Sequence, residues 1–320
     1  MTKILVTGGL GFIGSEFVNL VKRNSDHKVI VLDKYTYAAD ESRIEGDLSD
    51  LTIIKGDICD INQLCYVYPE LYEVEYVVNF AAETHVDNSI SDGTPFMHTN
   101  VMGVYNLLEY ARGLKNLKKF VQISTDEVYG DMAYCRGENG ADESFNLRPS
   151  SYYAASKASA DMLVMAAART YGVPYLITRT CNNYGEKQDK EKLIPKIMES
   201  IANDSVIPVY GDGQQTREWI HVEDNAKIQE KLIFADNLHT TNSIVNVGSG
   251  TRFKNIDIVN FLQRANPDVK WSFVPDRKGH DREYALNCEK LRSIIGPYEK
   301  DLFPFSAFLM RVAFSGKLGV

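Results

Sequence analysis

The stretch KILVTGGLGFIGSEFVNLV, residues 3–21, indicates how the chain begins to fold. A short apolar run of strand type leads into three glycines spaced GxxGxxG, Gly8, Gly11 and Gly14, and a helix-like segment follows. Glycine allows a tight turn, lets a pyrophosphate approach the backbone and lets the helix pack close to the sheet. The N-terminus of such a helix offers N–H groups and a positive dipole end to phosphates. The sequence therefore predicts a dinucleotide-binding turn between a strand and a helix.

Further residues indicate which dinucleotide binds. Asp33 lies 19 residues after the last of these glycines, where a carboxylate accepts hydrogen bonds from ribose hydroxyls and repels a 2′-phosphate. Asp57, just past the third predicted strand, is a candidate to hold the adenine, and Ala81 and Ala82 are small enough to let backbone pass close to the cofactor. The neighbouring Lys34 weakens the exclusion of NADP, but NAD fits these residues better.

Strand-like and helix-like segments alternate through the first half of the chain. The strand-like runs are nearly continuous in Ile, Val, Leu and Phe, as in parallel strands covered on both faces. They are residues 3–6, 29–32, 52–55, 76–80, 120–124 and 175–178. The helix-like segments are residues 12–24, 101–114 and 153–171. This alternation predicts an α/β fold, a Rossmann-type doubly wound parallel sheet.

The pattern changes after about residue 178. Two runs, 206–210 and 218–222, flank a Gly-Asp-Gly turn and predict a hairpin. An apolar run, a helix-like segment and a charged loop follow at 244–247, 256–264 and 275–281. We expect a NAD-binding domain and a smaller α/β C-terminal lobe for the substrate. The predicted domain comprises residues 1–178 plus about 221–247, and the lobe about 179–220 and 248–320.

Composition excludes several classes of protein. The 320 residues are 44% hydrophobic and 24% charged, which is ordinary for a globular chain and argues against disorder. A net charge of −8 gives no support to a nucleic-acid partner. No stretch reaches the ~18 to 20 uncharged apolar residues of a membrane-spanning helix. Five cysteines without a CxxC pair indicate reduced thiols in a cytoplasmic protein, and we expect no bound metal.

Two groups of polar residues are of a catalytic type. Tyr153 and Lys157 lie four residues apart in a predicted helix and share a face, so the ammonium is expected to lower the tyrosine pKa from about 10. Thr125, Asp126 and Glu127 end the fifth predicted strand, at the sheet edge where active sites of open α/β sheets lie. Both carboxylates reach one site only if strand geometry ends near Thr125. The alternative for Asp126 is that it caps the following turn.

Motifs along nearly the whole chain, to about Asn287, match a known family. They are TGGLGFIGS (7–15), GDICD (56–60), NFAAETHVDNSI (79–90), TNVMGVYNLL (99–108), ISTDEVYG (123–130), YAASKASAD (153–161), NNYG (182–185), EKLIP (191–195), YGDGQQTREWIHVED (210–224) and DRKGHDREYA (276–285). On these segments the sequence resembles the extended short-chain dehydrogenase/reductase family, and within it the dTDP-glucose 4,6-dehydratases. Among these motifs, Thr-Asp-Glu best distinguishes the dehydratases from the rest of the family, because the epimerases and decarboxylases lack the Asp-Glu pair.

The resemblance implies a reaction and roles for five residues. The chain would be a NAD-dependent lyase that converts dTDP-glucose to dTDP-4-keto-6-deoxyglucose, a step of deoxysugar biosynthesis such as that of rhamnose. Tyr153, assisted by Thr125 and Lys157, would remove the C4 hydroxyl proton while hydride leaves C4 for NAD. Glu127 would then take the C5 proton and Asp126 would protonate the departing C6 hydroxyl. Hydride would return to C6.

The resemblance also implies binding residues and an assembly. The implied cofactor residues are Gly8, Gly11, Phe12, Ile13, Gly14, Asp33, Lys34, Thr36, Asp57, Ile58, Ala81, Ala82, Tyr153, Lys157 and Cys181. The implied substrate residues are His85, Thr125, Asn182, Lys192, Leu193, Val209, Tyr210, Arg217, Asn246, Arg282 and Tyr284. A homodimer through the helices near 101–114 and 153–171 is implied as well.

Some positions depart from the family pattern. Glu186 and Lys187 follow NNYG where a proline is usual, Glu218 replaces an Asp, and Tyr152 replaces a proline. At Asn287, itself in place of an Asp, the similarity thins, and the usual terminal helix ending in aromatic residues is not evident. The alternatives are a UDP-glucose 4,6-dehydratase, an epimerase or decarboxylase on the same fold, and a catalytically inactive NAD-binding protein.

Overall fold

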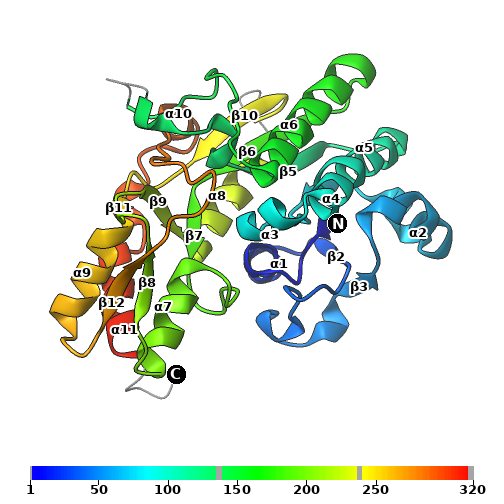
Figure 1. The fold of residues 1–320 in the computed structure, drawn as a ribbon. Helices are drawn as coiled ribbons and strands as arrows, with labels where there is room; N and C mark the ends of the chain where they lie inside the picture. Colours follow the sequence, from blue (N-terminus) through cyan, green and yellow to red (C-terminus); the bar gives the residue numbers. More distant parts are fainter. Residues whose placement is uncertain (1, 135–138, 236–239, 316–320) are drawn as a thin grey trace.

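The computed structural model describes residues 2–134, 139–235 and 240–315 (Figure 1). Its centre is a seven-stranded sheet in the order β10-β6-β5-β4-β1-β2-β3, in which every neighbouring pair is parallel. The strands are β1 (Lys3–Thr7), β2 (Lys28–Asp33), β3 (Thr52–Lys55), β4 (Tyr76–Asn79), β5 (Lys119–Thr125), β6 (Tyr175–Thr180) and β10 (Ser243–Val247). The predicted Rossmann-type sheet is confirmed.

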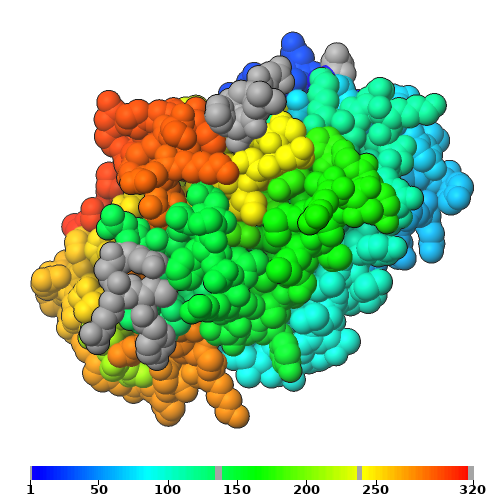
Figure 2. All heavy atoms as spheres, turned by 90° about the horizontal axis from the view of Figure 1, so that it is seen from above, coloured from blue at the N-terminus to red at the C-terminus, as the bar shows by residue number. Residues whose placement is uncertain are grey.

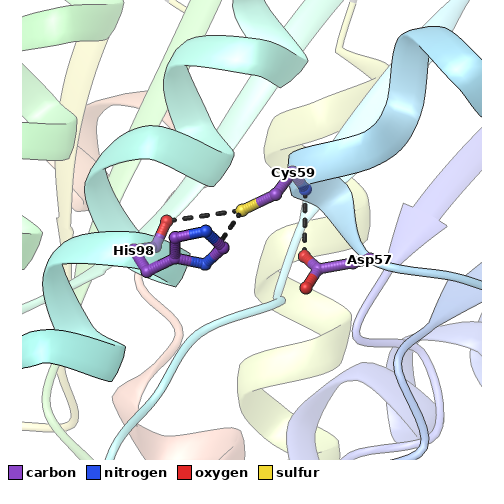
Figure 3. A group of neighbouring side chains, drawn as sticks. All are labelled: Asp57, Cys59 and His98. Carbon is purple, nitrogen blue, oxygen red and sulfur yellow. Dashed lines mark hydrogen bonds between the residues drawn. The ribbon is translucent and has the colours of Figure 1, made fainter.

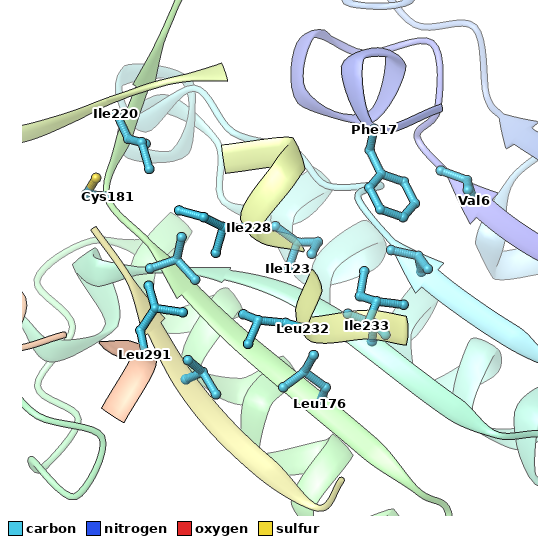
Figure 4. Packing of buried hydrophobic residues seen from close by; sticks show 14 of the residues in the cluster. Val6, Phe17, Ile123, Leu176, Cys181, Ile220, Ile228, Leu232, Ile233 and Leu291 are labelled. Carbon is cyan, nitrogen blue, oxygen red and sulfur yellow. The ribbon is translucent and has the colours of Figure 1, made fainter. Parts of the chain in front are cut away.

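Helices cover both faces of this sheet. Alternate residues of a buried strand point to opposite faces, so Ile4 and Val6 join one apolar core and Leu5 joins the other. The first face carries α1 (Phe12–Asn24), α8 (Val222–Phe234) and α10 (Glu289–Ile295). The second carries α2 (Ile61–Val67), α5 (Val104–Gly113) and α6 (Tyr152–Tyr171), of which α5 and α6 lie side by side (Figures 1 and 2). Figure 4 shows Phe17 and Leu232 among the residues of the first core.

A smaller part of the chain packs beside the large sheet (Figure 1). One small sheet contains β7 (Asn182–Tyr184), β9 (Thr216–His221) and β11 (Arg252–Lys254), and another contains β8 (Ile207–Tyr210) and β12 (Trp271–Val274). Its helices are α7 (Leu193–Ala202), α9 (Asn255–Ala265) and α11 (Phe305–Ala313). Its core combines aliphatic side chains with aromatic rings, and Trp219 stacks on Phe305 with ring centroids 5.0 Å apart.

Short helical segments complete the fold. They are η1 (Glu41–Arg43), η2 (Leu48–Asp50), η3 (Ile58–Asp60), η4 (Pro69–Glu73), α3 (Val86–Ser91), α4 (Thr94–Phe96), the π-helical η5 (Met97–Gly103), η6 (Asp126–Tyr129), η7 (Met132–Tyr134) and η8 (Glu299–Asp301). The predicted helix over 101–114 is thus divided between η5 and α5. No helix among the described residues is long and apolar enough to cross a membrane.

The chain passes between its two parts more than once. The helix α8 and the strand β10, from the segment 221–247, lie on the seven-stranded sheet. The helix α10 lies inside the range predicted for the lobe, yet Leu291 of this helix also packs on the large sheet.

The predicted hairpin over 206–222 is wrong. The strand β8 pairs in parallel with β12, whereas β9 pairs with β11 and β7. The turn itself is present, because Gly211 and Gly213 have φ values of 60° and 69°. It directs the two strands into different sheets, since each finds a partner from a distant part of the chain.

The end of the chain also differs from the prediction. The sequence gives no clear sign of a terminal helix, yet α11 is present and buries Phe305, Phe308 and Leu309. These side chains pack in the core of the smaller part beside Trp219 and Tyr184. The apolar residues recur at positions that face this core, which stabilises a short helix through tertiary packing.

Substitution of Gly14 tests the packing of the glycine turn. A Cβ on Gly14 would lie 2.3 Å from the carbonyl oxygen of Gly8, which is backbone and has no room to move. We expect Gly14→Ala to lower the free energy of unfolding by about 1 to 3 kcal/mol, the usual cost of overpacking. Urea unfolding measures it. The matched control is Gly113→Ala, where a Cβ meets nothing within 4 Å, and equal stability of both variants would contradict the prediction.

Candidate active site

A cavity of about 430 Å³ lies at the carboxyl ends of the strands of the large sheet, and residues of the smaller part complete its wall. The structure brings to this wall thirteen of the residues expected to contact the cofactor, in addition to Tyr153 and Lys157. They are Gly8, Gly11, Phe12, Ile13, Gly14, Asp33, Lys34, Thr36, Asp57, Ile58, Ala81, Ala82 and Cys181.

The glycine turn and the start of α1 form one end of the cavity. Gly8 has a φ of 67°, and a Cβ there would lie 2.6 Å from the backbone nitrogen of Ala81, so only glycine fits. The first turn of α1 follows, and its N–H groups lack partners within the helix. Beside it Asp33 is buried and accepts hydrogen bonds from the backbone N–H groups of Leu10 and Tyr35, both at 3.0 Å. The residues present therefore fit a dinucleotide at this end.

The strand β5 ends where the catalytic residues begin. Thr125 is its last residue, and its hydroxyl accepts a hydrogen bond of 3.3 Å from the N–H of Glu127. The backbone then turns into the 3-10 segment η6, so strand alternation stops at Thr125. The departure from strand geometry that two neighbouring carboxylates require is confirmed. The cap of this turn is Thr125, not Asp126.

The two carboxyl groups lie in different surroundings. Burial raises the pKa of Asp126 to about 8, and the nearby carboxylates of Glu127 and Glu218 add to the effect. Burial also raises the pKa of Glu127, but the guanidinium groups of Arg217 and Arg277 oppose that rise. The Oδ2 atom of Asp126 has no hydrogen-bond partner among the described residues. Asp126 is therefore neutral at pH 7, as a general acid must be.

Tyr153 and Lys157 line the cavity on one face of α6. Burial raises the pKa of Tyr153 well above its usual range, Glu127 raises it further, and a hydrogen bond with Thr125 lowers it in part. Burial lowers the pKa of Lys157 to about 8, and its ammonium donates to the carbonyl of Ile123. Lys157 is not among the groups that shift the pKa of Tyr153 here, so the lowering expected from the lysine stays a prediction.

Basic residues from the smaller part lie opposite the sheet. Six of the residues expected to bind substrate line the cavity besides Thr125: His85, Asn182, Lys192, Leu193, Tyr210 and Arg217. The Lys192 ammonium donates to the Thr84 carbonyl at 3.2 Å. Arg217 is buried, and its guanidinium group donates to the Asp281 carbonyl at 2.9 Å. These cations give this end of the cavity the character of an anion site.

Five predicted site residues do not line the cavity: Asp126, Val209, Asn246, Arg282 and Tyr284. Asp126 lies behind the wall, where its Oδ1 accepts a hydrogen bond from Thr125 at 3.1 Å. Tyr284 supports Arg217, because the guanidinium group lies 4.2 Å from the centre of its ring.

The other three have structural contacts. Val209 is buried in the core of the smaller part. Asn246 is buried and joins separate segments, since it accepts from Tyr129 at 2.7 Å and donates to the Ala141 carbonyl at 2.8 Å. Arg282 is exposed and pairs with Asp212 at 2.7 Å.

Several residues of the wall are absent from the sequence prediction. They include Glu83, Thr84, Glu191, Lys196 and Arg277. Lys196 of α7 lies four residues after Lys192, the N-cap residue of this helix, and this spacing of about one helical turn was a usable signal. Arg277 lies in the charged loop at 275–281, where only the fold decides which of the basic side chains faces inward.

Comparison with known proteins places the chain in a family. The model of the NAD dependent epimerase/dehydratase family matches residues 4–248. The chain is 40% identical over 295 residues to the low-salt glycan biosynthesis protein Agl12 of Haloferax volcanii, covering 91% of this chain and 92% of that protein. It is 38% identical over 319 residues to the dTDP-glucose 4,6-dehydratase of Haemophilus influenzae, covering 92% and 93%.

Solved structures agree with these matches. The dTDP-glucose 4,6-dehydratase of Streptomyces venezuelae, crystallised with NAD bound, is 35% identical and superposes with a TM-score of 0.87, covering 99% of this chain and 98% of that one. The resemblance to dTDP-glucose 4,6-dehydratases is confirmed by these similarities. Because the family model spans most of the sequence and the relatives match it almost from end to end, the chain belongs to the NAD dependent epimerase/dehydratase family.

Proposed function

We propose that this chain is a NAD-dependent 4,6-dehydratase that converts dTDP-glucose to dTDP-4-keto-6-deoxyglucose. The observation that carries the proposal is the pair of carboxyl groups after β5, Asp126 and Glu127, in unlike electrostatic surroundings beside Tyr153. An epimerase or a decarboxylase needs no acid for a departing C6 hydroxyl. The named activity of the relatives from Haemophilus influenzae and Streptomyces venezuelae supports the same reaction.

NAD, when bound, would supply a nicotinamide ring that can accept a hydride and give it back. The glycine turn and the first turn of α1 would hold the pyrophosphate. Asp33 would hold the ribose hydroxyls with the lone pairs that Leu10 and Tyr35 leave available. Asp57 would hold the adenine.

The catalytic residues move protons at three positions of the sugar. Tyr153, with Thr125 and Lys157, would take the proton of the C4 hydroxyl as the ketone forms, once the positive charge of bound NAD lowers the raised pKa of the tyrosine. Glu127, close to two guanidinium groups, takes the C5 proton, which the new ketone acidifies. Asp126, neutral at pH 7, lies behind the cavity wall in contact with the Thr125 hydroxyl, so its proton would reach the C6 hydroxyl through Thr125, and that hydroxyl would leave as water. A proton returns to C5 when the hydride reaches C6, so the net change is the loss of one water.

The substrate is anchored through its diphosphate and its base. Lys192, Lys196, Arg217 and Arg277 line the cavity and can neutralise the diphosphate. Tyr210, also in the wall, lies at the end of β8 and is the candidate to contact the pyrimidine. A diphosphate held there brings the hexose toward Glu127 and Tyr153.

Transfer of an isotope label tests the reaction. With dTDP-glucose deuterated at C4, we expect the deuterium at C6 of a product that has lost one water, because hydride is removed and returned within one active site. Mass spectrometry and NMR locate the label, with UDP-glucose, CDP-glucose and GDP-mannose compared in parallel. Label that remains at C4 or is lost to solvent would contradict the proposal, as would an isomer or a decarboxylated product.

Substitution of Glu127 separates oxidation from elimination. Glu127→Gln keeps the size of the side chain and removes its basicity, so oxidation at C4 should proceed while turnover falls by about 10²- to 10⁴-fold. We expect NADH to accumulate on the enzyme with an undehydrated 4-keto sugar, measured by absorbance and by mass spectrometry after quenching. Tyr153→Phe is the comparison, and it should fail before NADH forms. Turnover of Glu127→Gln within a few-fold of wild type would remove Glu127 from the mechanism.

Substitution of Asp126 tests whether this carboxyl group is protonated in the folded protein, through the pH dependence of the free energy of unfolding. The pKa of Asp126 is raised to about 8 in the folded chain, whereas an unfolded aspartate has a value of about 3.9. Between these values the unfolded state has released a proton that the folded state retains. Stability due to this group is therefore lost as pH rises through this window, by up to about 1.4 kcal/mol per pH unit.

We expect Asp126→Asn to gain stability relative to wild type from pH 5 to pH 8, and the difference to become constant above that range. Urea unfolding at several pH values measures it, and Asp60→Asn, at an exposed aspartate, is the matched control. A difference that does not change with pH would mean that Asp126 is ionised in the folded protein.

We also propose a cytoplasmic homodimer formed through α5, α6 and the preceding turn η5. Large apolar side chains are exposed there: Met102, Tyr105 and Met162 are 50%, 45% and 59% accessible. The four described cysteines are free thiols, in keeping with a reducing compartment. Light scattering should give a dimer mass for wild type and a monomer for Met102→Glu with Met162→Glu. Tyr66→Glu, at an exposed site on α2, is the control, and a monomeric wild type would contradict the dimer.

A further inference from the structure

Three side chains with metal-binding atoms lie together beside the cofactor cavity, outside the catalytic centre (Figure 3). Asp57 follows β3, Cys59 lies in η3, and His98 lies in the π-helical turn η5. One ligand atom from each lies within 4.8 Å of the other two. It is the one such group of three found in residues 2–134, 139–235 and 240–315.

The distances fit a shared cation. The Cys59 Sγ lies 3.5 Å from the His98 Nδ1. A tetrahedral zinc ion with its usual bonds to sulfur and nitrogen holds these two atoms about 3.6 Å apart. A thiol–imidazole hydrogen bond alone gives a similar contact, so the third group is decisive. The carboxylate of Asp57 is close enough to share the cation, and a water can take the fourth position.

The carboxylate keeps lone pairs for a ligand. Asp57 Oδ1 accepts from the Cys59 N–H at 2.9 Å, and Oδ2 pairs with the Lys34 ammonium at 2.7 Å. Each carboxylate oxygen has two lone-pair sites, so the two contacts leave two sites, one for the adenine that Asp57 is proposed to hold and one for a cation. Coordination would share or replace the contact with Lys34, which is exposed and can move.

The backbone that carries these ligands is fixed. Asn106 of α5 donates to the Cys59 carbonyl at 2.7 Å, which ties η3 to the helix that continues η5. A Cβ on Gly103, at the end of η5, would lie 2.5 Å from the Ile58 side chain, so the two segments are in close contact. A π-helical turn is a rare feature that is frequent at functional sites. The backbone segments that carry Cys59 and His98 are therefore held together before a cation binds.

The donor atoms select a class of metal. A thiol, an imidazole and a carboxylate suit zinc and its neighbours, whereas calcium and magnesium prefer oxygen ligands alone.

We propose that Asp57, Cys59 and His98 form a binding site for a divalent cation of the zinc class. The site adjoins the cavity, because Asp57 and Lys34 belong to its wall while Cys59 and His98 do not. It shares no residue with the sugar chemistry proposed above, which uses Thr125, Asp126, Glu127, Tyr153 and Lys157. The sequence offered no signal for it, because His98 is distant in sequence from the GDICD segment.

Titration of the purified protein with its bound NAD tests the site. We expect calorimetry to give one Zn²⁺ per chain, and Co²⁺ to produce the absorption band of a cobalt–thiolate bond. Cys59→Ser should abolish that band, and His98→Ala should weaken Zn²⁺ binding at least about tenfold, since loss of outer contacts alone costs about 10- to 100-fold. The matched control is Asp60→Asn, next to the site and exposed, which should bind as wild type does.

Two results would overturn the proposal. One is Zn²⁺ binding that is equal in wild type, Cys59→Ser and His98→Ala, which would mean that ions bind elsewhere on the surface. The other is the absence of a thiolate band with Co²⁺. Circular dichroism and the amount of bound NAD confirm that the variants are folded. No turnover enters the measurement, so its outcome is separate from that of the proposed dehydratase.

Discussion

Burial of two adjacent carboxyl groups at the end of β5 is the constraint on which the site depends. Taking a carboxylate out of water is costly unless it is protonated or compensated by positive charge. Asp126 meets this constraint by remaining neutral, with a pKa raised to about 8. Glu127 meets it through the guanidinium groups of Arg217 and Arg277, which come from the smaller part of the chain. Two consecutive residues thus serve as an acid and a base.

The fold provides both the turn that carries the two carboxyl groups and the positive charges that lie near Glu127. The parallel sheet ends at Thr125 and releases the chain into η6, which is where an open α/β sheet places its site. The smaller part must then stay against the sheet to keep its cations near Glu127. Arg43 helps to hold it, because this buried side chain pairs with Asp189 at 2.8 Å and donates to the Lys187 carbonyl at 3.1 Å.

Local sequence patterns predicted much of the fold and of the site. What they missed depends on contacts between segments that are distant along the chain. The glycine turn, α1 and the strand alternation follow from short stretches of sequence, and so does the departure from strand geometry after Thr125. The partners of β8 and β9 lie far along the chain, so the turn between them resembles a hairpin that does not form. Asn246 and Arg282 sit in segments that match the family, but their contacts with Tyr129 and Asp212 lie away from the cavity. Such contacts depend on the fold and leave no local signal.

Direct titration of the Asp126 carboxyl tests the central claim, that one of two neighbouring acids is neutral at working pH. Carbon-13 NMR of protein labelled at aspartate carboxyl groups can follow it, with Asp126→Asn used to assign the resonance. We expect the resonance that is missing in the variant to titrate near pH 8, as burial beside Glu127 and Glu218 requires. A titration below about pH 5, where ordinary aspartates ionise, would contradict the division of roles between the two carboxyl groups.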